Sequence, residues 1–109
     1  MEKIVEQTLL FDFYGELLSE RKRSVMDMYY NEDLSLAEIA LEIGISRQGV
    51  RDIIKKSEEE LFFYEEKLGL ASKIKNVELC VSELNILANE HELSKEMRDK
   101  ISELLRIVK

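Results

Sequence analysis

Residues 34–56 read LSLAEIALEIGISRQGVRDIIKK, and this stretch decides the fold of the chain. Its apolar residues recur at steps of three and four on both sides of Gly44, as they do on the buried faces of two helices. Ser35 with Glu38 three residues later has the spacing of a capping box, and Ser46 is placed to cap the second helix. Gly44 supplies the backbone freedom that a tight turn between these helices needs.

The two predicted helices have complementary apolar faces. Ala40 is small enough for the helices to approach closely, and larger side chains fill the space between them: Ile39, Ile43, Ile45, Val50 and Ile53. This is the pattern of the helix-turn-helix motif of DNA-binding proteins, whose second helix enters the major groove. The alternative interpretation is an ordinary helical hairpin inside a bundle, and nucleic-acid binding is a separate inference.

The rest of the chain also favours helices, because its 109 residues include no proline and only four glycines. We therefore expect an all-α helix-turn-helix bundle with a long motif helix and C-terminal helices. The first predicted helix ends near Leu18, and the second runs from the Ser19 cap to about Tyr30. The two motif helices run from Ser35 to Gly44 and from Ser46 to Gly69. Two more helices flank a polar break at residues 89–93.

The length of the chain supports a single hydrophobic core. We expect one helical domain, residues 1–109, with a helix-turn-helix core at 19–57 and a helical extension at 58–109. The motif helix would span about 33 Å, so its second half must pack on another element. The predicted partner is the C-terminal region, with its two apolar stripes: Ile74, Val77, Val81, Leu84 and Ala88, then Met97, Ile101, Leu104 and Val108.

These stripes, together with Phe62, Phe63 and Tyr64, leave two alternatives open. Helices with a repeat near 3.5 residues readily form contacts between chains, which predicts a homodimer. The other interpretation is that the same side chains close the core of one chain.

Composition excludes several classes of protein. No apolar run approaches the roughly 18 residues of a membrane span, and residues 1–6 lack the features of a secretory signal, so we expect a cytoplasmic protein without membrane insertion. The chain has one cysteine, Cys80, and one histidine, His91, so it can form neither an intrachain disulfide nor a zinc site with four cysteine or histidine ligands. With no nucleophile–base pair and no glycine-rich phosphate loop, we expect a non-enzyme without cofactor or metal. Apolar neighbours favour a buried Cys80 thiol over a redox site, and His91 is expected at a helix end.

If the second motif helix reads nucleic acid, the side chains that point outward near its start make the contacts. The predicted contacts are Ser46, which also caps the helix, and Arg47, Gln48, Arg51 and Lys55, with Lys56 on the flank. Asp52 lies among these outward positions. Arginine holds guanine or phosphate with two hydrogen bonds, glutamine pairs with adenine, and the helix start attracts a phosphate. The alternative is that these residues are an ordinary solvated surface.

Charge is distributed unevenly along the chain. The net charge of −7 divides into −4 for residues 1–34, +1 for 35–57, −4 for 58–69 and 0 for 70–109. The motif is thus the only positive block, and Arg21, Lys22 and Arg23 form a second basic patch suited to backbone contacts. The overall charge repels a polyanion at long range, so we expect modest affinity. A helix-turn-helix that binds protein, or is structural only, is the alternative.

Residues 18–56, LSERKRSVMDMYYNEDLSLAEIALEIGISRQGVRDIIKK, resemble the fourth region of bacterial sigma factors, in which the second motif helix reads promoter DNA. The preceding LLFDFYGELLSERKR and the following FFYEEKLGL narrow the resemblance to the YlxM-like proteins, small bacterial proteins encoded beside the signal recognition particle genes. The resemblance covers about residues 8–70, and residues 71–109 are similar only in helical character.

This resemblance implies a regulatory protein that binds DNA or RNA and acts in the signal recognition particle pathway. The family's SRQ segment falls on residues 46–48, and its YSLAEIA-like segment falls on residues 34–40. Leu34 replaces an aromatic residue common in the family, Gly49 replaces alanine and Arg51 replaces tyrosine, so the reading face is more basic here. The rival hypothesis is an adaptor that contacts components of the particle without reading DNA.

Overall fold

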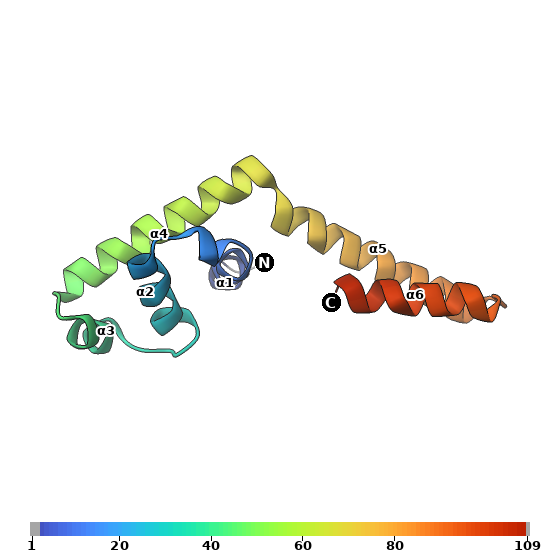
Figure 1. Ribbon diagram of the computed structural model, residues 1–109, viewed down its shortest axis with the longest axis horizontal. Coiled ribbons are helices and arrows are strands. Elements are labelled where there is room, and N and C mark those ends of the chain that lie inside the picture. The colour runs from blue at the N-terminus through green and yellow to red at the C-terminus, as the bar shows by residue number, and fades with distance from the viewer. Residues whose placement is uncertain (1–2, 109) are drawn as a thin grey trace. The chain divides into compact units, whose positions relative to one another are not determined.

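Helices form all the regular structure of the described chain in a computed structural model (Figure 1). They are α1 (Lys3–Tyr14), the 3₁₀ helix η1 (Gly15–Leu17), α2 (Glu20–Tyr30), α3 (Leu36–Ile43), α4 (Arg47–Leu68), α5 (Leu70–Glu90) and α6 (Lys95–Val108). The structure describes residues 3–108, with side chains from Glu6 onward. Residues 1 and 2 of the segment that we inspected for a secretory signal, and the side chains of residues 3–5, therefore lie outside the described part. The predicted all-α fold is confirmed.

Helices α3 and α4 form the predicted helix-turn-helix. The Glu38 amide donates a hydrogen bond to the Ser35 hydroxyl (3.1 Å) and the Ser35 amide donates one to the Glu38 carboxylate (3.0 Å), which completes the capping box. These bonds hold the pKa of Glu38 below its usual value. Gly44 ends α3 with φ of 73°, and the Gly49 amide donates to the Ser46 hydroxyl at 3.0 Å to begin α4.

A continuous buried stripe along α4 organises the N-terminal unit. It consists of Val50, Ile54, Ser57 and Leu61. Helices α1, α2 and α3 all contact α4, and Figure 1 shows them along one side of it. Ser57, the polar member, donates its hydroxyl hydrogen to the Ile53 carbonyl at 2.7 Å and so is buried without an unpaired group.

The second half of α4 packs on α1, whereas the sequence predicted the C-terminal region as its partner. The Tyr14 hydroxyl donates a hydrogen bond to the Glu65 carboxylate (2.5 Å), and the ring centroids of Tyr14 and Tyr64 are 6.1 Å apart. At Gly15 a Cβ atom would lie 2.9 Å from the Phe11 ring, so glycine permits this tight passage from α1 into η1. The periodicity showed that α1 has an apolar face but not which helix covers it.

Residues 70–109 form a second compact unit, in which α5 and α6 pack as an antiparallel helical hairpin. Ala71, Val81 and Ala88 are buried on α5, and no described side chain of α6 is buried. The division between the units falls after Gly69, so the boundary predicted at residue 58 lies inside the continuous helix α4. The single-domain organisation stays a prediction.

Cys80 is exposed, so the prediction of a buried thiol was wrong. Its neighbour Val81 is 5% exposed, and one residue corresponds to about 100° around a helix. Apolar neighbours in the sequence therefore do not place a residue on the covered face. His91 is exposed just beyond the end of α5, as predicted.

The turn at Gly44 gives a first prediction. Nothing lies within 4 Å of a Cβ atom built there, so substitution meets only the cost of the left-handed backbone. We expect Gly44→Ala to lower the free energy of unfolding by about 1 kcal/mol, and Gly44→Asn to lower it less, because asparagine tolerates this conformation. Urea denaturation followed by circular dichroism measures both changes. Equal losses for the two variants would contradict the backbone explanation.

Candidate nucleic-acid interface

The start of α4 presents the predicted contact residues to solvent. The side chains of Arg47, Gln48, Arg51, Asp52, Lys55 and Lys56 are all exposed. Val50 and Ile54 hold the opposite face of the same turns in the core. Because residues three and four apart share a helix face, the exposed residues form one surface on a rigid element.

Two of the predicted contact residues already have partners within the chain. The Ser46 hydroxyl is occupied as the helix cap, so its first role is to start α4. The Gln48 side-chain amide donates a hydrogen bond to the Asp52 carboxylate at 3.0 Å. Asp52 thus orients Gln48, and a base that pairs with Gln48 would have to compete with this contact.

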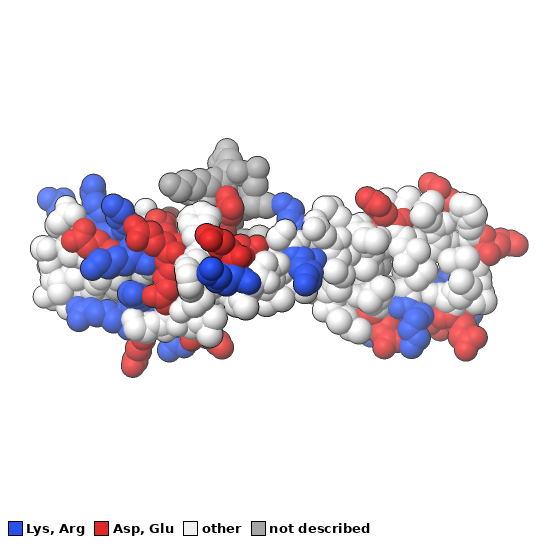
Figure 2. Space-filling model, turned by 90° about the horizontal axis from the view of Figure 1, so that it is seen from above, with Lys and Arg blue, Asp and Glu red and all other residues white. Residues whose placement is uncertain are grey.

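The four cations of the surface have no ion pair with any side chain that the structure describes: Arg47, Arg51, Lys55 and Lys56. In Figure 2, basic side chains gather at the end of the N-terminal unit where α4 begins, with acidic side chains among them. Unpaired cations on a rigid helix are the groups that bind phosphate or the guanine edge. We call the surface made by Arg47, Gln48, Arg51, Lys55 and Lys56 the basic face.

The basic face ends abruptly at Lys56. The next charged residue is Glu58, after the buried Ser57, and it accepts a hydrogen bond from the Tyr30 hydroxyl. Burial, together with the neighbouring Glu58 carboxylate, raises the pKa of Tyr30 well above its usual range. The ten residues from Arg47 to Lys56 span about 15 Å, which suits one crossing of a major groove about 12 Å wide.

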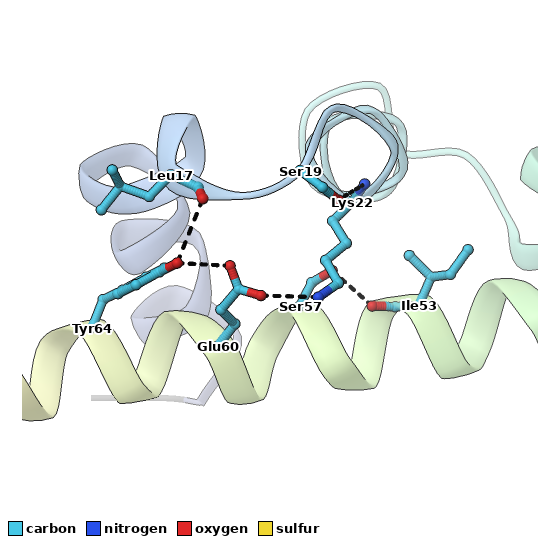
Figure 3. Close-up of polar contacts among 7 residues, drawn as sticks. All are labelled: Leu17, Ser19, Lys22, Ile53, Ser57, Glu60 and Tyr64. Atoms are coloured by element: carbon cyan, nitrogen blue, oxygen red, sulfur yellow. Dashed lines mark hydrogen bonds and ion pairs between the residues drawn. The ribbon is translucent and has the colours of Figure 1, made fainter.

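The second basic patch is divided by the fold. Arg21 and Arg23 are exposed, but Lys22 turns toward α4 and forms a 2.9 Å ion pair with Glu60 (Figure 3). Sequence reasoning missed this pairing, because residues 22 and 60 are far apart in the chain. Lys22 therefore links α2 to α4, and Arg21 and Arg23 are the members of the patch available to a partner.

Glu60 joins two elements at this point. Its carboxylate accepts hydrogen bonds from the Lys22 ammonium group and from the Tyr64 hydroxyl, each at 2.9 Å (Figure 3). The Lys22 bond is the main reason that the pKa of Glu60 lies below its usual value, while the nearby carboxylate raises the pKa of Tyr64. The Tyr64 oxygen also lies 3.5 Å from the Leu17 carbonyl, too far for a strong second bond.

Two further observations bear on function. Among the residues that the structure describes, no three His, Cys, Asp or Glu side chains lie where they could share a metal ion. No helix in residues 3–108 is both long enough and apolar enough to cross a membrane.

Residues 1–104 match the family described as "Putative helix-turn-helix protein, YlxM / p13 like", UPF0122. The chain belongs to this family. A UPF0122 protein of Clostridium kluyveri is 53% identical over 78 residues, 72% of this chain and 70% of the relative. UPF0122 proteins of Listeria welshimeri and Bacillus cereus are 42% identical over 97% and 98%, respectively, of both chains.

Membership of the UPF0122 family extends farther than the sequence motifs indicated. We expected the resemblance to cover about residues 8–70, but the match to residue 104 includes both helices of the hairpin. The α5–α6 hairpin is therefore part of the family's architecture and not an addition peculiar to this chain.

The geometry of the basic face gives a second prediction. Because Arg47 and Arg51 are exposed and form no ion pair with a described side chain, Arg47→Ala/Arg51→Ala should change the free energy of unfolding by less than about 0.5 kcal/mol. Ser46→Ala should cost about 1 kcal/mol, because it removes the cap of α4. Urea denaturation compares the two. A larger loss of unfolding free energy for the double variant than for Ser46→Ala would show that the two arginines stabilise the fold.

The Lys22–Glu60 pair gives a third prediction, on pH. Because the folded-state pKa of Glu60 is lowered, its stabilising contribution is present above the unfolded-state pKa of about 4.3 and is lost as pH falls through the folded value. Lys22→Ala should therefore reduce stability at pH 7, and the difference from wild type should shrink below about pH 4. Arg21→Ala is the matched control and should have little effect at either pH. A Lys22 effect that is the same at both pH values would contradict the assignment.

Proposed function

We propose that this UPF0122 protein is a cytoplasmic, non-enzymatic regulator that binds nucleic acid, with DNA as the first candidate, through the basic face of α4. The observation that carries the proposal is the set of unpaired cations on the outward side of the second motif helix. Their position corresponds to the helix that enters the major groove in helix-turn-helix proteins.

The residues of the basic face have different proposed tasks. Arg51 and Gln48 point outward one turn apart and contact base edges, Arg51 toward guanine and Gln48 toward adenine. Arg47 and the start of α4 bind a phosphate, and Lys55 and Lys56 bind the flanking backbone. Arg21 and Arg23 supply further backbone contacts, whereas Lys22 does so only if it leaves Glu60.

The charge of the chain sets the expected strength of binding. The net charge of −7 opposes approach of a polyanion, and only a few cations are free to replace counterions. The logarithm of affinity should fall with the logarithm of salt concentration with a slope near −0.9 for each phosphate contact. Binding should thus be modest and lost readily as salt is raised.

The fourth prediction tests this function by fluorescence anisotropy. The protein is titrated into labelled duplex DNA and, separately, signal recognition particle RNA, at about 50 and 200 mM salt. We expect Arg47→Ala/Arg51→Ala to weaken binding by about tenfold or more, because the variant loses a base contact and a phosphate contact. The polymer bound more tightly identifies the target class.

The matched control is Lys95→Ala/Arg106→Ala. It removes the same charge from exposed positions of α6 and should leave affinity nearly unchanged. Equal losses for the two double variants would show that binding depends on total charge and not on the basic face. No binding to either polymer at the lower salt concentration would refute the proposal.

A second candidate function has an observation of its own. Leu41 on α3 is 85% exposed, the largest exposed fraction among the exposed large apolar side chains of the described residues. An adaptor that docks on a protein component of the signal recognition particle would use this side chain. Leu41→Ser should then abolish binding of the purified component and leave the anisotropy titrations unchanged, whereas the double arginine variant should have the opposite effect.

A further inference from the structure

The α5–α6 hairpin leaves an apolar stripe exposed on each of its helices. On α5, Val77, Leu84 and Leu87 are 37%, 42% and 53% exposed. On α6, Met97, Leu104 and Ile107 are 53%, 37% and 72% exposed. Both stripes have steps of seven and three residues, the spacing of helices that pack on a further helix.

The two stripes lie on the same side of the hairpin. On α5 each stripe residue comes one position before a buried or half-buried residue, as Leu84 precedes Asn85 and Leu87 precedes Ala88. On α6 the same holds, because Leu104 precedes the half-buried Leu105. A step of one residue is a rotation of about 100° around the helix axis. Because α5 and α6 run in opposite directions, a step of one residue back from the line where they contact each other leads to the same side of the hairpin on both helices. We call this side the apolar face of the hairpin.

The opposite side of the hairpin is different. It carries Leu79 and Ile86 on α5, but Asp99, Ser102 and Arg106 on α6. In Figure 2 uncharged surface runs along this unit between rims of charged side chains. The hairpin has an incomplete core, because no described side chain of α6 is buried. Another layer of structure packed on the apolar face would complete this core.

We propose that a second copy of this chain covers the apolar face, through a twofold contact in which the two α5 helices run antiparallel. Charge along the helix favours this occupant. Within α5, residues 70–80, with Lys73 and Lys75, carry +1, and residues 81–90, with Glu83 and Glu90, carry −2. A twofold axis places the start of α5 in one chain near the end of α5 in the other, so opposite charges meet twice.

Net charge and area agree with self-association at this surface. Residues 70–109 have no net charge, whereas residues 1–69 carry the whole −7, so the hairpin is the part of the chain that approaches its copy without repulsion. The face is about 30 Å long and two helices, about 20 Å, wide, or about 600 Å² per chain. Specific interfaces bury about 600–1,000 Å² per partner, so this face has the area of a small stable interface. The contact goes beyond the proposed function and does not depend on nucleic-acid binding.

The first test measures the mass of the full chain by sedimentation equilibrium. We expect twice the chain mass of 12.8 kDa at about 100 μM protein. Leu84→Glu/Leu104→Glu puts two charges on the apolar face and should give the mass of one chain with helicity retained. Leu79→Glu/Ile86→Glu is the matched control on the opposite side and should leave the dimer intact. A wild-type mass of one chain, or a control as disruptive as the face variant, would overturn the proposal.

A charge exchange keeps the test decisive if the face variant fails to fold. Lys73→Glu/Lys75→Glu makes both ends of α5 acidic, and Glu83→Lys/Glu90→Lys makes both ends basic. Each variant alone should dimerise at least tenfold more weakly than wild type, and an equimolar mixture should form a two-chain species that contains one of each. Native mass spectrometry distinguishes these species. Variants that each dimerise as tightly as wild type would contradict the antiparallel twofold arrangement.

Discussion

One buried stripe on α4 holds the N-terminal unit together. Val50, Ile54, Ser57 and Leu61 succeed one another at steps of three and four, so a single helix face runs the length of the unit. Helices α1, α2 and α3 all pack on α4. The outward face of its first turns is left to solvent as a consequence, and it is displayed on an element that three other helices hold in place.

The acidic second half of α4 serves this packing. Glu58 accepts a hydrogen bond from Tyr30, Glu60 from Lys22 and Tyr64, and Glu65 from Tyr14. Three of the five glutamates in residues 58–69 thus fasten α1 and α2 to the long helix. Only Glu60 has a cationic partner among these contacts, so the segment keeps most of its negative charge and limits the basic face to the start of the helix.

The two units differ in how completely they bury their apolar residues. The N-terminal unit has a core in which Val25, Met26, Ile39, Val50 and Leu61 are fully enclosed. The hairpin buries side chains on α5 alone, because two helices cannot surround one another. The N-terminal unit, with its enclosed core, therefore presents a charged surface on α4, whereas the hairpin, with its incomplete core, presents an apolar surface.

The sequence by itself determined the local structure. The serine caps, the Gly44 turn and the periodicity of residues 34–56 act between neighbours in the chain, and they placed the helix-turn-helix and the exposed positions of the basic face. The tertiary structure decided which surfaces meet: α1 on the second half of α4, Lys22 on Glu60, and Cys80 in solvent beside a buried Val81. Periodicity shows that a helix has an apolar face, but the identity of the covering element depends on contacts between residues distant in the chain, which no local pattern encodes.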